Sequence, residues 1–343
     1  MNQPSLACDE FTRRQFLKRS AVGGGAILVG SSRSRAAEPA KKAAQIAITL
    51  DLEMARNFPR WEDTEWDYQK GNLTPQVKKY AVEVGKRVKE RGGVVHYFVV
   101  GQVLEQADVS WLKELADEGH SIGNHTYDHV FLLARTIESV QYRFARSPWL
   151  VRGRSVPDLI RDNVAMTNEA LKTRLGIDAA GFRTPGGFAE GLSGREDLQQ
   201  MLLELGFRWV SSKYPAHAGI VDLHRTGESP SADAIKAILD AQKEAQPFVY
   251  PTGLVEIPMS PVSDIVAFRS GRWKLDDFMS VTKESLQWTI EHGAVFDFLA
   301  HPSCLGVVDP DFKTIDLICD VVRQAGDRAK IISLDAIATN VKS

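Results

Sequence analysis

Short apolar runs alternate with amphipathic segments through most of this sequence, and this alternation constrains the fold more than any other feature. Apolar runs of roughly four to eight residues suit buried strands, and longer segments with apolar residues three or four apart suit helices. Strands and helices in regular alternation predict a mainly parallel sheet. The candidate strands are Ile46–Glu53, Val94–Val100, His120–Asn124, Ala180–Thr184, Phe207–Ser212, Leu254–Met259, Val295–His301 and Lys330–Leu334.

The amphipathic segments carry residues that begin and end helices. In the first segment Thr74 can cap the N-terminus, Pro75 suits the first turn, and glycines follow Arg91. We therefore expect one α/β domain over residues 44–341, a distorted (β/α) barrel of seven to eight parallel strands with its active site at the C-terminal strand ends. Further helices are predicted near Val109–Glu118, Leu159–Leu175, Glu196–Leu205, Ala232–Lys243, Asp276–His292 and Phe312–Gln324.

The composition excludes several other classes of protein. The chain has 343 residues, of which 43% are hydrophobic and 25% charged, with a formal net charge of −2. This balance is typical of a globular protein. It lacks the basic surplus that general nucleic-acid binding needs, so we expect no nucleic-acid partner. Three cysteines are too few for a disulfide framework. We expect Cys319 to be a buried apolar residue, and the role of Cys304, near His301, is left open.

Residues 1–36 resemble a twin-arginine export signal. Arg13 and Arg14 precede a weakly apolar, glycine-rich run and a small-residue cleavage site after Ala36. The run is too short to span a bilayer. Export by the twin-arginine translocation machinery predicts a periplasmic or secreted protein with no membrane span in the mature chain, in which residues 37–43 are a short linker. The alternative is a disordered basic tail, and the oligomeric state is left open.

Two longer segments interrupt the strand and helix alternation, at residues 54–72 and 130–156. In a barrel both segments follow strands and lie at the C-terminal rim, where loops carry function. Their aromatic side chains either contact a ligand or pack in the core. The aromatic residues are Trp61, Trp66 and Tyr68 in the first segment, and Tyr142, Phe144 and Trp149 in the second.

Candidate metal ligands lie at two of the predicted strand ends. His125 and His129 are four residues apart, and a helical turn there would place both imidazoles on one face. Asp51 and Glu53 are two residues apart at the end of a strand, so their side chains face the same space. Four ligand-type groups are thereby expected to converge, which indicates a metal site.

Two more strand ends carry polar residues of the same kind, Arg183 and His301. Taken singly, Arg183 could form a structural salt bridge and His301 could be a buried core histidine. Neither interpretation explains why every such group falls at a C-terminal strand end, the face where barrel enzymes place their active sites. The pattern favours metal-dependent hydrolysis.

The sequence resembles the polysaccharide deacetylases that share the NodB homology domain, a distorted (β/α) barrel with a metal centre. The resemblance extends over roughly residues 46–338 and is strongest at the family's second motif. The matching segments are 115–129 for the second motif, Arg183–Gly187 for the third and Leu299–His301 for the last, with 206–212 and Val255–Pro258 nearest the branch of peptidoglycan deacetylases and metal-independent allantoinase-like proteins.

Two departures from the family pattern affect the predicted roles. The first motif reads Asp51-Leu52-Glu53, closer to the Asp-x-Asp arrangement of the peptidoglycan branch than to two adjacent aspartates. We assign Asp51 as the base and Glu53 as the ligand. The reverse assignment stays open, because either carboxylate could reach the ion. Many relatives also have a fourth-motif aspartate that orients the final histidine, and residues 209–215 contain none, so the partner of His301 is unassigned.

The resemblance implies removal of N-acetyl (or O-acetyl) groups from an extracytoplasmic polysaccharide or peptidoglycan. It implies that Zn²⁺ or another divalent ion is held by Glu53, His125 and His129, that Asp51 accepts the proton of water, and that His301 protonates the departing amine. Two alternatives remain: an allantoinase-like or imidase-like hydrolase of a small cyclic amide, and a non-catalytic carbohydrate-binding relative. The candidate substrate-contacting residues are Arg183, which would orient Asp51, with Pro185, Gly186, Trp61 and Trp66.

Overall fold

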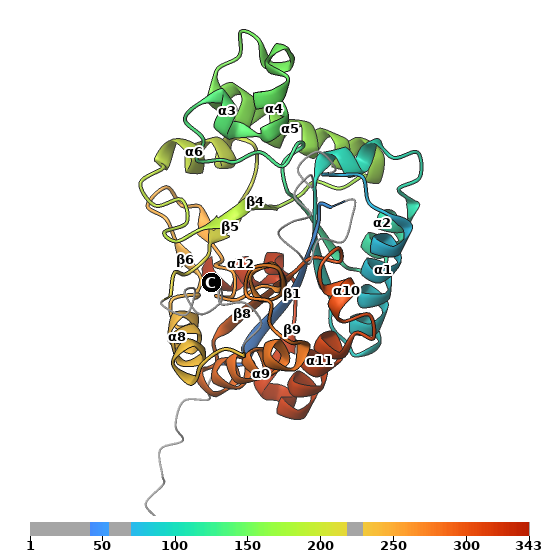
Figure 1. The fold of residues 1–343 in the computed structure, drawn as a ribbon, viewed down its shortest axis with the longest axis vertical. Helices are drawn as coiled ribbons and strands as arrows, with labels where there is room; N and C mark the ends of the chain where they lie inside the picture. The colour runs from blue at the N-terminus through green and yellow to red at the C-terminus, as the bar shows by residue number, and fades with distance from the viewer. Residues whose placement is uncertain (1–41, 55–69, 218–228, 343) are drawn as a thin grey trace, which may run out of the picture. The chain divides into compact units, whose positions relative to one another are not determined.

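A curled, nine-stranded sheet forms the centre of the computed structural model, which describes residues 42–54, 70–217 and 229–342 (Figure 1). The strand order is β6-β7-β5-β4-β3-β2-β1-β8, and β9 pairs with β1 beside this path. All ladders are parallel except β6–β7. The strands are β1 Ala44–Leu52, β2 Val95–Val99, β3 Ser121–Asn124, β4 Gly181–Phe188, β5 Trp209–Lys213, β6 Phe248–Val249, β7 Val255–Glu256, β8 Val295–Ala300 and β9 Ala329–Ile331.

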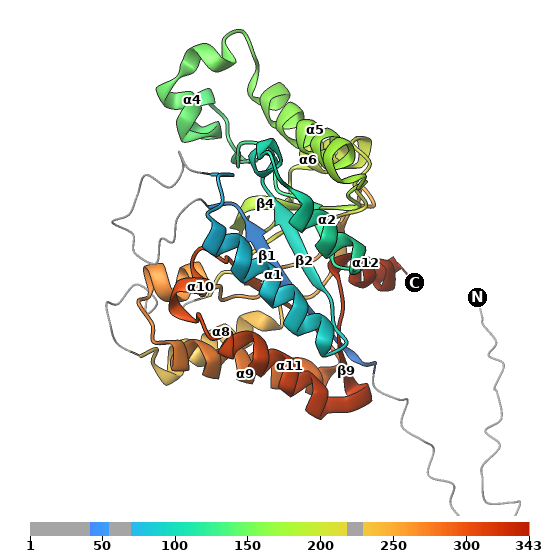
Figure 2. The ribbon, with the colours of Figure 1, turned by 90° about the vertical axis from the view of Figure 1, so that its right-hand side faces the viewer.

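The predicted helices follow these strands (Figure 2), and the N-terminus of the first helix is capped as the sequence predicts. Thr74 Oγ1 accepts a hydrogen bond from Val77 N at 3.3 Å, and Pro75 occupies the first turn. The helices are α1 Pro75–Glu90, α2 Ser110–Asp117, α3 Ile137–Val140, α4 Tyr142–Arg146, α5 Val156–Leu175, α6 Glu196–Glu204, α8 Ala232–Gln242, α9 Leu275–His292, α10 Leu305–Val308, α11 Lys313–Ala325 and α12 Leu334–Lys342, with short 3₁₀ segments at Gly101–Glu105 (η2), Pro148–Val151 (η3) and Gly326–Arg328 (η5) and a π-helix at Ile265–Ser270 (η4).

The main hydrophobic core lies between the central strands and the helices α1, α9 and α11. Every residue of β1, β2 and β8 is buried, as expected for parallel strands covered on both faces. Residues that alternate with this core point to the inside of the curled sheet. They include the polar side chains of Thr49, Arg183 and Asp297, which are buried and hydrogen-bonded to one another. Polar residues therefore occupy part of the barrel interior and support the site above them.

The mainly parallel α/β fold and the distorted barrel are confirmed, and the barrel is open at one edge. Among the described strands, no ladder joins β7 to β8, and a backbone hydrogen bond from Ser260 N to Asp297 O at 3.0 Å crosses this gap. The strand predicted at Leu254–Met259 is mostly irregular, because only Val255 and Glu256 pair with β5. The structure is thus a half-barrel with an antiparallel β6–β7 pair at one edge.

Several predictions concern residues outside the described part of the chain. The export signal in residues 1–36, most of the linker, and Trp61, Trp66 and Tyr68 fall there. None of the helices in the described ranges is long and apolar enough to cross a membrane.

Candidate active site

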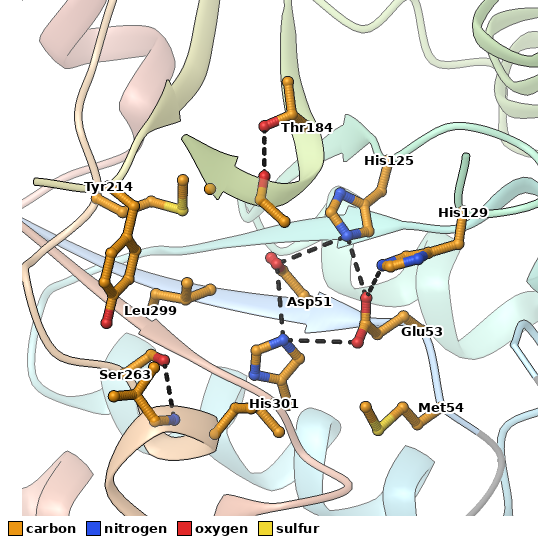
Figure 3. Close-up of a pocket in the computed structure, with 15 residues that line it drawn as sticks. Asp51, Glu53, Met54, His125, His129, Thr184, Tyr214, Ser263, Leu299 and His301 are labelled. Carbon is orange, nitrogen blue, oxygen red and sulfur yellow. Dashed lines mark hydrogen bonds and ion pairs between the residues drawn. The ribbon is translucent and has the colours of Figure 1, made fainter. Parts of the chain in front are cut away.

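The two carboxylates at the end of β1 face one cavity of about 290 Å³ (Figure 3). Asp51 is in β1, and Glu53 is the first residue after the end of that strand. The two residues are two positions apart, so both side chains lie on the same side of the chain. Each residue is only 4% exposed. The parallel neighbours β2 and β8 hold β1 in register, with Asp51 opposite Phe98 and Leu50 opposite Ala300. The cavity therefore opens at the C-terminal ends of the strands.

His125 and His129 converge through a turn, and the helical turn considered from the sequence is wrong. Residues 125–130 are not helical, and Thr126 and His129 both have φ of 58°. The side chain of Asn124 accepts a hydrogen bond from Thr126 N at 2.8 Å, and Thr126 Oγ1 accepts one from Val130 N at 3.0 Å. These local bonds hold a left-handed backbone that is uncommon for residues other than glycine. The two imidazole rings are consequently 5.1 Å apart, centre to centre.

Glu53, His125 and His129 form a group of ligand atoms that all lie within 4.8 Å of one another. Glu53 Oε2 is 2.5 Å from His129 Nε2 and 3.2 Å from His125 Nε2. His125 Nδ1 is 2.9 Å from the carbonyl oxygen of Arg183. A donated hydrogen bond there leaves Nε2 as the lone-pair nitrogen. One carboxylate and two imidazole nitrogens directed at one point fit the donor set of a zinc-type ion.

A buried lysine that the sequence reasoning did not identify adjoins this donor set. Lys70 Nζ donates to Glu53 Oε1 at 2.7 Å and lies 3.3 Å from His129 Nε2. Burial alone would raise the pKa of Glu53, but His129 and Lys70 hold it well below the usual range. Burial lowers the pKa of His129 to about 4, with Glu53 opposing and Lys70 adding to the effect. Glu53 is therefore an anion and His129 a neutral imidazole near pH 7, which are the forms that bind metals.

Arg183 orients Asp51 from beneath the cavity floor. Its Nη1 lies 3.2 Å from Asp51 Oδ1 and donates to Thr49 Oγ1 at 2.7 Å, and its Nη2 pairs with Asp297. Burial raises the pKa of Asp297 to about 6, although Arg183 opposes the change. Arg183 is completely buried and is not among the residues lining the cavity. In this structure it contacts Asp51 rather than the space for a substrate, because the sheet covers it on every side.

His301 faces the carboxylates from the end of β8. Its Nε2 is 3.6 Å from Glu53 Oε1 and 3.9 Å from Asp51 Oδ2. Its Nδ1 lies 2.8 Å from Oδ1 of Asp264, a fully buried residue that also accepts a hydrogen bond from His301 N at 2.7 Å. Burial alone would lower the pKa of His301, but Asp264, followed by Glu53 and Asp51, raises it to about 9.

Asp264 is therefore the carboxylate partner of His301. The fourth motif, residues 209–215, contains no aspartate that could take this role. It lies 37 residues before His301 and immediately before the π-helix η4. No spacing rule in the sequence connects the two residues, because the contact forms only when the segment before η4 packs against the end of β8. Asp264 was accordingly missed from the sequence.

The glycines after Arg183 shape another wall of the cavity. Gly186 has φ of 74°, a conformation that suits glycine, and a Cβ on Gly187 would lie 2.4 Å from Cβ of Tyr214. Gly186 and Pro185 also line a second cavity of about 280 Å³, which shares His129 and Gly186 with the first. The two cavities are thus adjacent.

The aromatic residues of the segment 130–156 have different environments. Two of the residues that line the second cavity are Tyr142 and Phe131. Their side chains are 45% and 41% exposed, so both lie at the solvent-exposed edge of that cavity. Phe144 is buried in a hydrophobic cluster, and Trp149 is 65% exposed on η3. Of the three aromatics singled out in this segment, Tyr142 is the one that lines a cavity beside the carboxylates.

The two cysteines of the described chain are buried and not bonded to each other. Cys319 packs in the main core, as predicted. Burial raises the pKa of the Cys304 thiol well above its usual value, with Asp264 adding to the effect. Cys304 is consequently a buried residue of the main core whose thiol holds its proton more strongly than a free cysteine.

The curled parallel sheet, with carboxylates and imidazoles gathered at its C-terminal edge, has the architecture of an α/β-barrel enzyme. Residues 70–210 match the polysaccharide deacetylase family. None of the curated proteins compared with the chain matches it. The family match supports a hydrolase acting on carbon–nitrogen bonds.

Solved structures of low sequence identity share the fold over most of the chain. A polysaccharide deacetylase of Mycobacterium smegmatis, described as putative, is 17% identical, with a TM-score of 0.58 over 89% of this chain and 92% of its own. A probable polysaccharide deacetylase of Pseudomonas aeruginosa PAO1 is 12% identical, with a TM-score of 0.57 over 86% and 89%. Puue allantoinase is 14% identical, with a TM-score of 0.54 over 93% and 97%.

Proposed function

We propose that this protein is a metal-dependent deacetylase that removes N-acetyl (or O-acetyl) groups from an extracytoplasmic polysaccharide or peptidoglycan. The observation that carries the proposal is the position of Asp51 and His301 beside the donor set of Glu53, His125 and His129, all lining one cavity. A candidate base, a candidate acid and three metal ligands are the groups that amide hydrolysis requires.

The chain's own residues have distinct tasks in this reaction. A bound Zn²⁺ supplies Lewis-acid polarisation and lowers the pKa of water toward ~7. Asp51 accepts the proton of the attacking water through Oδ2, because Oδ1 is held by Arg183. His301 donates a proton from Nε2 to the departing amine, and Asp264 holds the opposite ring nitrogen so that Nε2 faces the carboxylates.

The second cavity favours an extended substrate over a small cyclic amide. It adjoins the carboxylate cavity at His129 and Gly186 and carries two partly exposed aromatic rings, Phe131 and Tyr142. Aromatic rings provide flat apolar surfaces against which a sugar ring can pack. A substrate with a ring on each side of the shared residues would fill both cavities.

A hydrolase of small cyclic amides is the second candidate. The observation that favours it is the fold shared with an allantoinase over 93% of the chain. The same purified protein separates the two candidates. Acetate release from chitooligosaccharide or peptidoglycan, with about one metal ion per chain, supports the deacetylase. Hydrolysis of allantoin without acetate release contradicts it.

The metal ligands and the export signal are tested separately. His125→Ala should reduce bound zinc well below one ion per chain and abolish turnover, whereas Tyr127→Phe, which removes only a hydrogen bond to Glu105, should keep both. Full zinc occupancy in His125→Ala would show that the donor set is wrong.

Replacement of Arg13 and Arg14 by Lys should leave uncleaved precursor in the cytoplasm. Normal export of that variant would overturn the extracytoplasmic assignment.

A further inference from the structure

The Lys70 side chain is almost completely buried beside the carboxylate that the proposed metal needs. It is 1% exposed, and its position is set by the backbone. Met54 and Lys70 form an antiparallel bridge, and Gly71 N donates to Glu53 O at 2.8 Å. The chain therefore returns to the end of β1 and places the Lys70 ammonium group against Glu53. A buried ammonium group requires a compensating anion, and Glu53 provides one.

The ammonium group contacts two of the three proposed ligands. Lys70 Nζ is 2.7 Å from Glu53 Oε1 and 3.3 Å from His129 Nε2. A divalent ion would need the Nε2 lone pair of His129 and a carboxylate oxygen of Glu53, and the Lys70 ammonium group lies against both of these groups. A divalent ion held by Glu53 and His129 would also lie close to a like charge in a buried site, where repulsion is stronger than in water. Repulsion between the ion and the ammonium group would therefore oppose their simultaneous presence beside Glu53.

We propose that Lys70 is an internal cation that competes with a divalent metal ion for Glu53 and His129, so that metal binding displaces its ammonium group. The inference rests on the metal site of the proposed function. In the metal-free protein Lys70 satisfies the buried Glu53 carboxylate and keeps the donor set assembled. The same contact weakens the affinity for the ion relative to an identical donor set without the lysine.

Calorimetric titration of the metal-free full-length protein with ZnCl₂ tests the competition. Lys70→Met removes the charge and keeps most of the side-chain length. We expect it to bind zinc at least about tenfold more tightly than the wild type, because the repulsion is lost. Lys70→Arg keeps the charge and should not bind more tightly. Lys79→Met, on the exposed face of α1, is the matched control and should leave the affinity unchanged.

The outcomes separate this inference from the proposed function. The competition is overturned if the wild type and Lys70→Met bind zinc with equal affinity. The proposed metal site is left intact in that case if adding His125→Ala abolishes zinc binding in both proteins. An absence of zinc binding in both proteins overturns the metal site and the competition together.

A second measurement uses the native chain in case Lys70→Met does not fold. Amine labelling followed by peptide mass spectrometry should modify Lys70 slowly in the metal-free protein, because its ammonium group is buried and ion-paired. Saturating ZnCl₂ should increase labelling of Lys70 severalfold and leave labelling of the exposed Lys79 unchanged. Equal labelling of Lys70 with and without zinc would contradict its displacement.

Discussion

Asp264 holds His301 at two points, through the ring Nδ1 at 2.8 Å and the backbone nitrogen at 2.7 Å. One buried carboxylate thus determines both where the backbone of His301 lies and how its ring is turned. The same carboxylate accepts a hydrogen bond from Leu305 N at 3.2 Å, which ties it to the start of α10. The imidazole is consequently held with Nε2 toward Asp51 and Glu53.

Asp264→Asn should lower the pKa of His301, because the anion that favours the imidazolium is removed while a hydrogen-bonding group remains. His301 would then lose its proton at a lower pH. The high-pH limb of the kcat/KM profile should move to lower pH by about one unit or more, where one unit corresponds to about 1.4 kcal/mol. Rate profiles of the wild type and the variant measure the shift. An unmoved limb would remove His301 as the acid or Asp264 as its partner.

Asp51→Asn and Glu53→Gln should have different effects. Asp51→Asn keeps the three proposed ligands, so zinc content should be unchanged while kcat falls ~10²- to 10⁴-fold through loss of the base. Glu53→Gln should weaken zinc binding, and added zinc should partly restore its activity. Zinc titration and kinetics on both variants provide the measurement. Metal loss in Asp51→Asn with retention in Glu53→Gln would reverse the two roles.

Arg183→Met should destabilise the protein even though Met fits an apolar interior. The substitution leaves two buried carboxylates, Asp51 and Asp297, without their shared guanidinium. Breaking a buried pair of this kind costs about 3–5 kcal/mol. Urea unfolding followed by circular dichroism measures the change, and Arg143→Met, at a half-exposed ion pair, is the control. A loss of less than about 1 kcal/mol in Arg183→Met would show that the network is not a structural support.

Tyr142→Ala should raise KM for an acetylated oligosaccharide and leave KM for an acetylated monosaccharide unchanged. The ring lines the second cavity, which only the longer substrate would reach. If the ring contributes as much as it does in an aromatic pair, about 0.5–1.5 kcal/mol, the expected increase is roughly two- to tenfold. Trp149→Ala removes an exposed aromatic that lines neither cavity and should change neither value. Equal KM for the oligosaccharide in wild type and Tyr142→Ala would exclude this cavity from substrate binding.

Features set by local spacing could be predicted from the sequence. The alternation of apolar runs and amphipathic segments predicts the parallel strands, because a buried strand and a half-buried helix need different periodicities. The two-residue spacing of Asp51 and Glu53 places them on one side of β1, since side chains alternate along a strand. Strand direction then gathers Arg183, His125 and His301 at the same edge of the sheet.

Other features of the site depend on contacts between segments that are distant in the chain, and no spacing pattern in the sequence predicts such contacts. The turn that brings His129 to His125 depends on Asn124, which is anchored by hydrogen bonds to α5. The open edge between β7 and β8 depends on how far the sheet curls.

The sequence alone determined the order of strands and helices and placed the carboxylates and imidazoles at the C-terminal strand ends, because strand periodicity and the alternation of strands with helices are local features of the chain. Only the tertiary structure decided the partners of those groups. Asp264 reaches His301 across 37 residues, and Lys70 reaches Glu53 through a backbone bridge. Neither separation is a period of a helix or a strand. The charges that set the protonation of His301 and Glu53 therefore became identifiable only when packing brought the segments together.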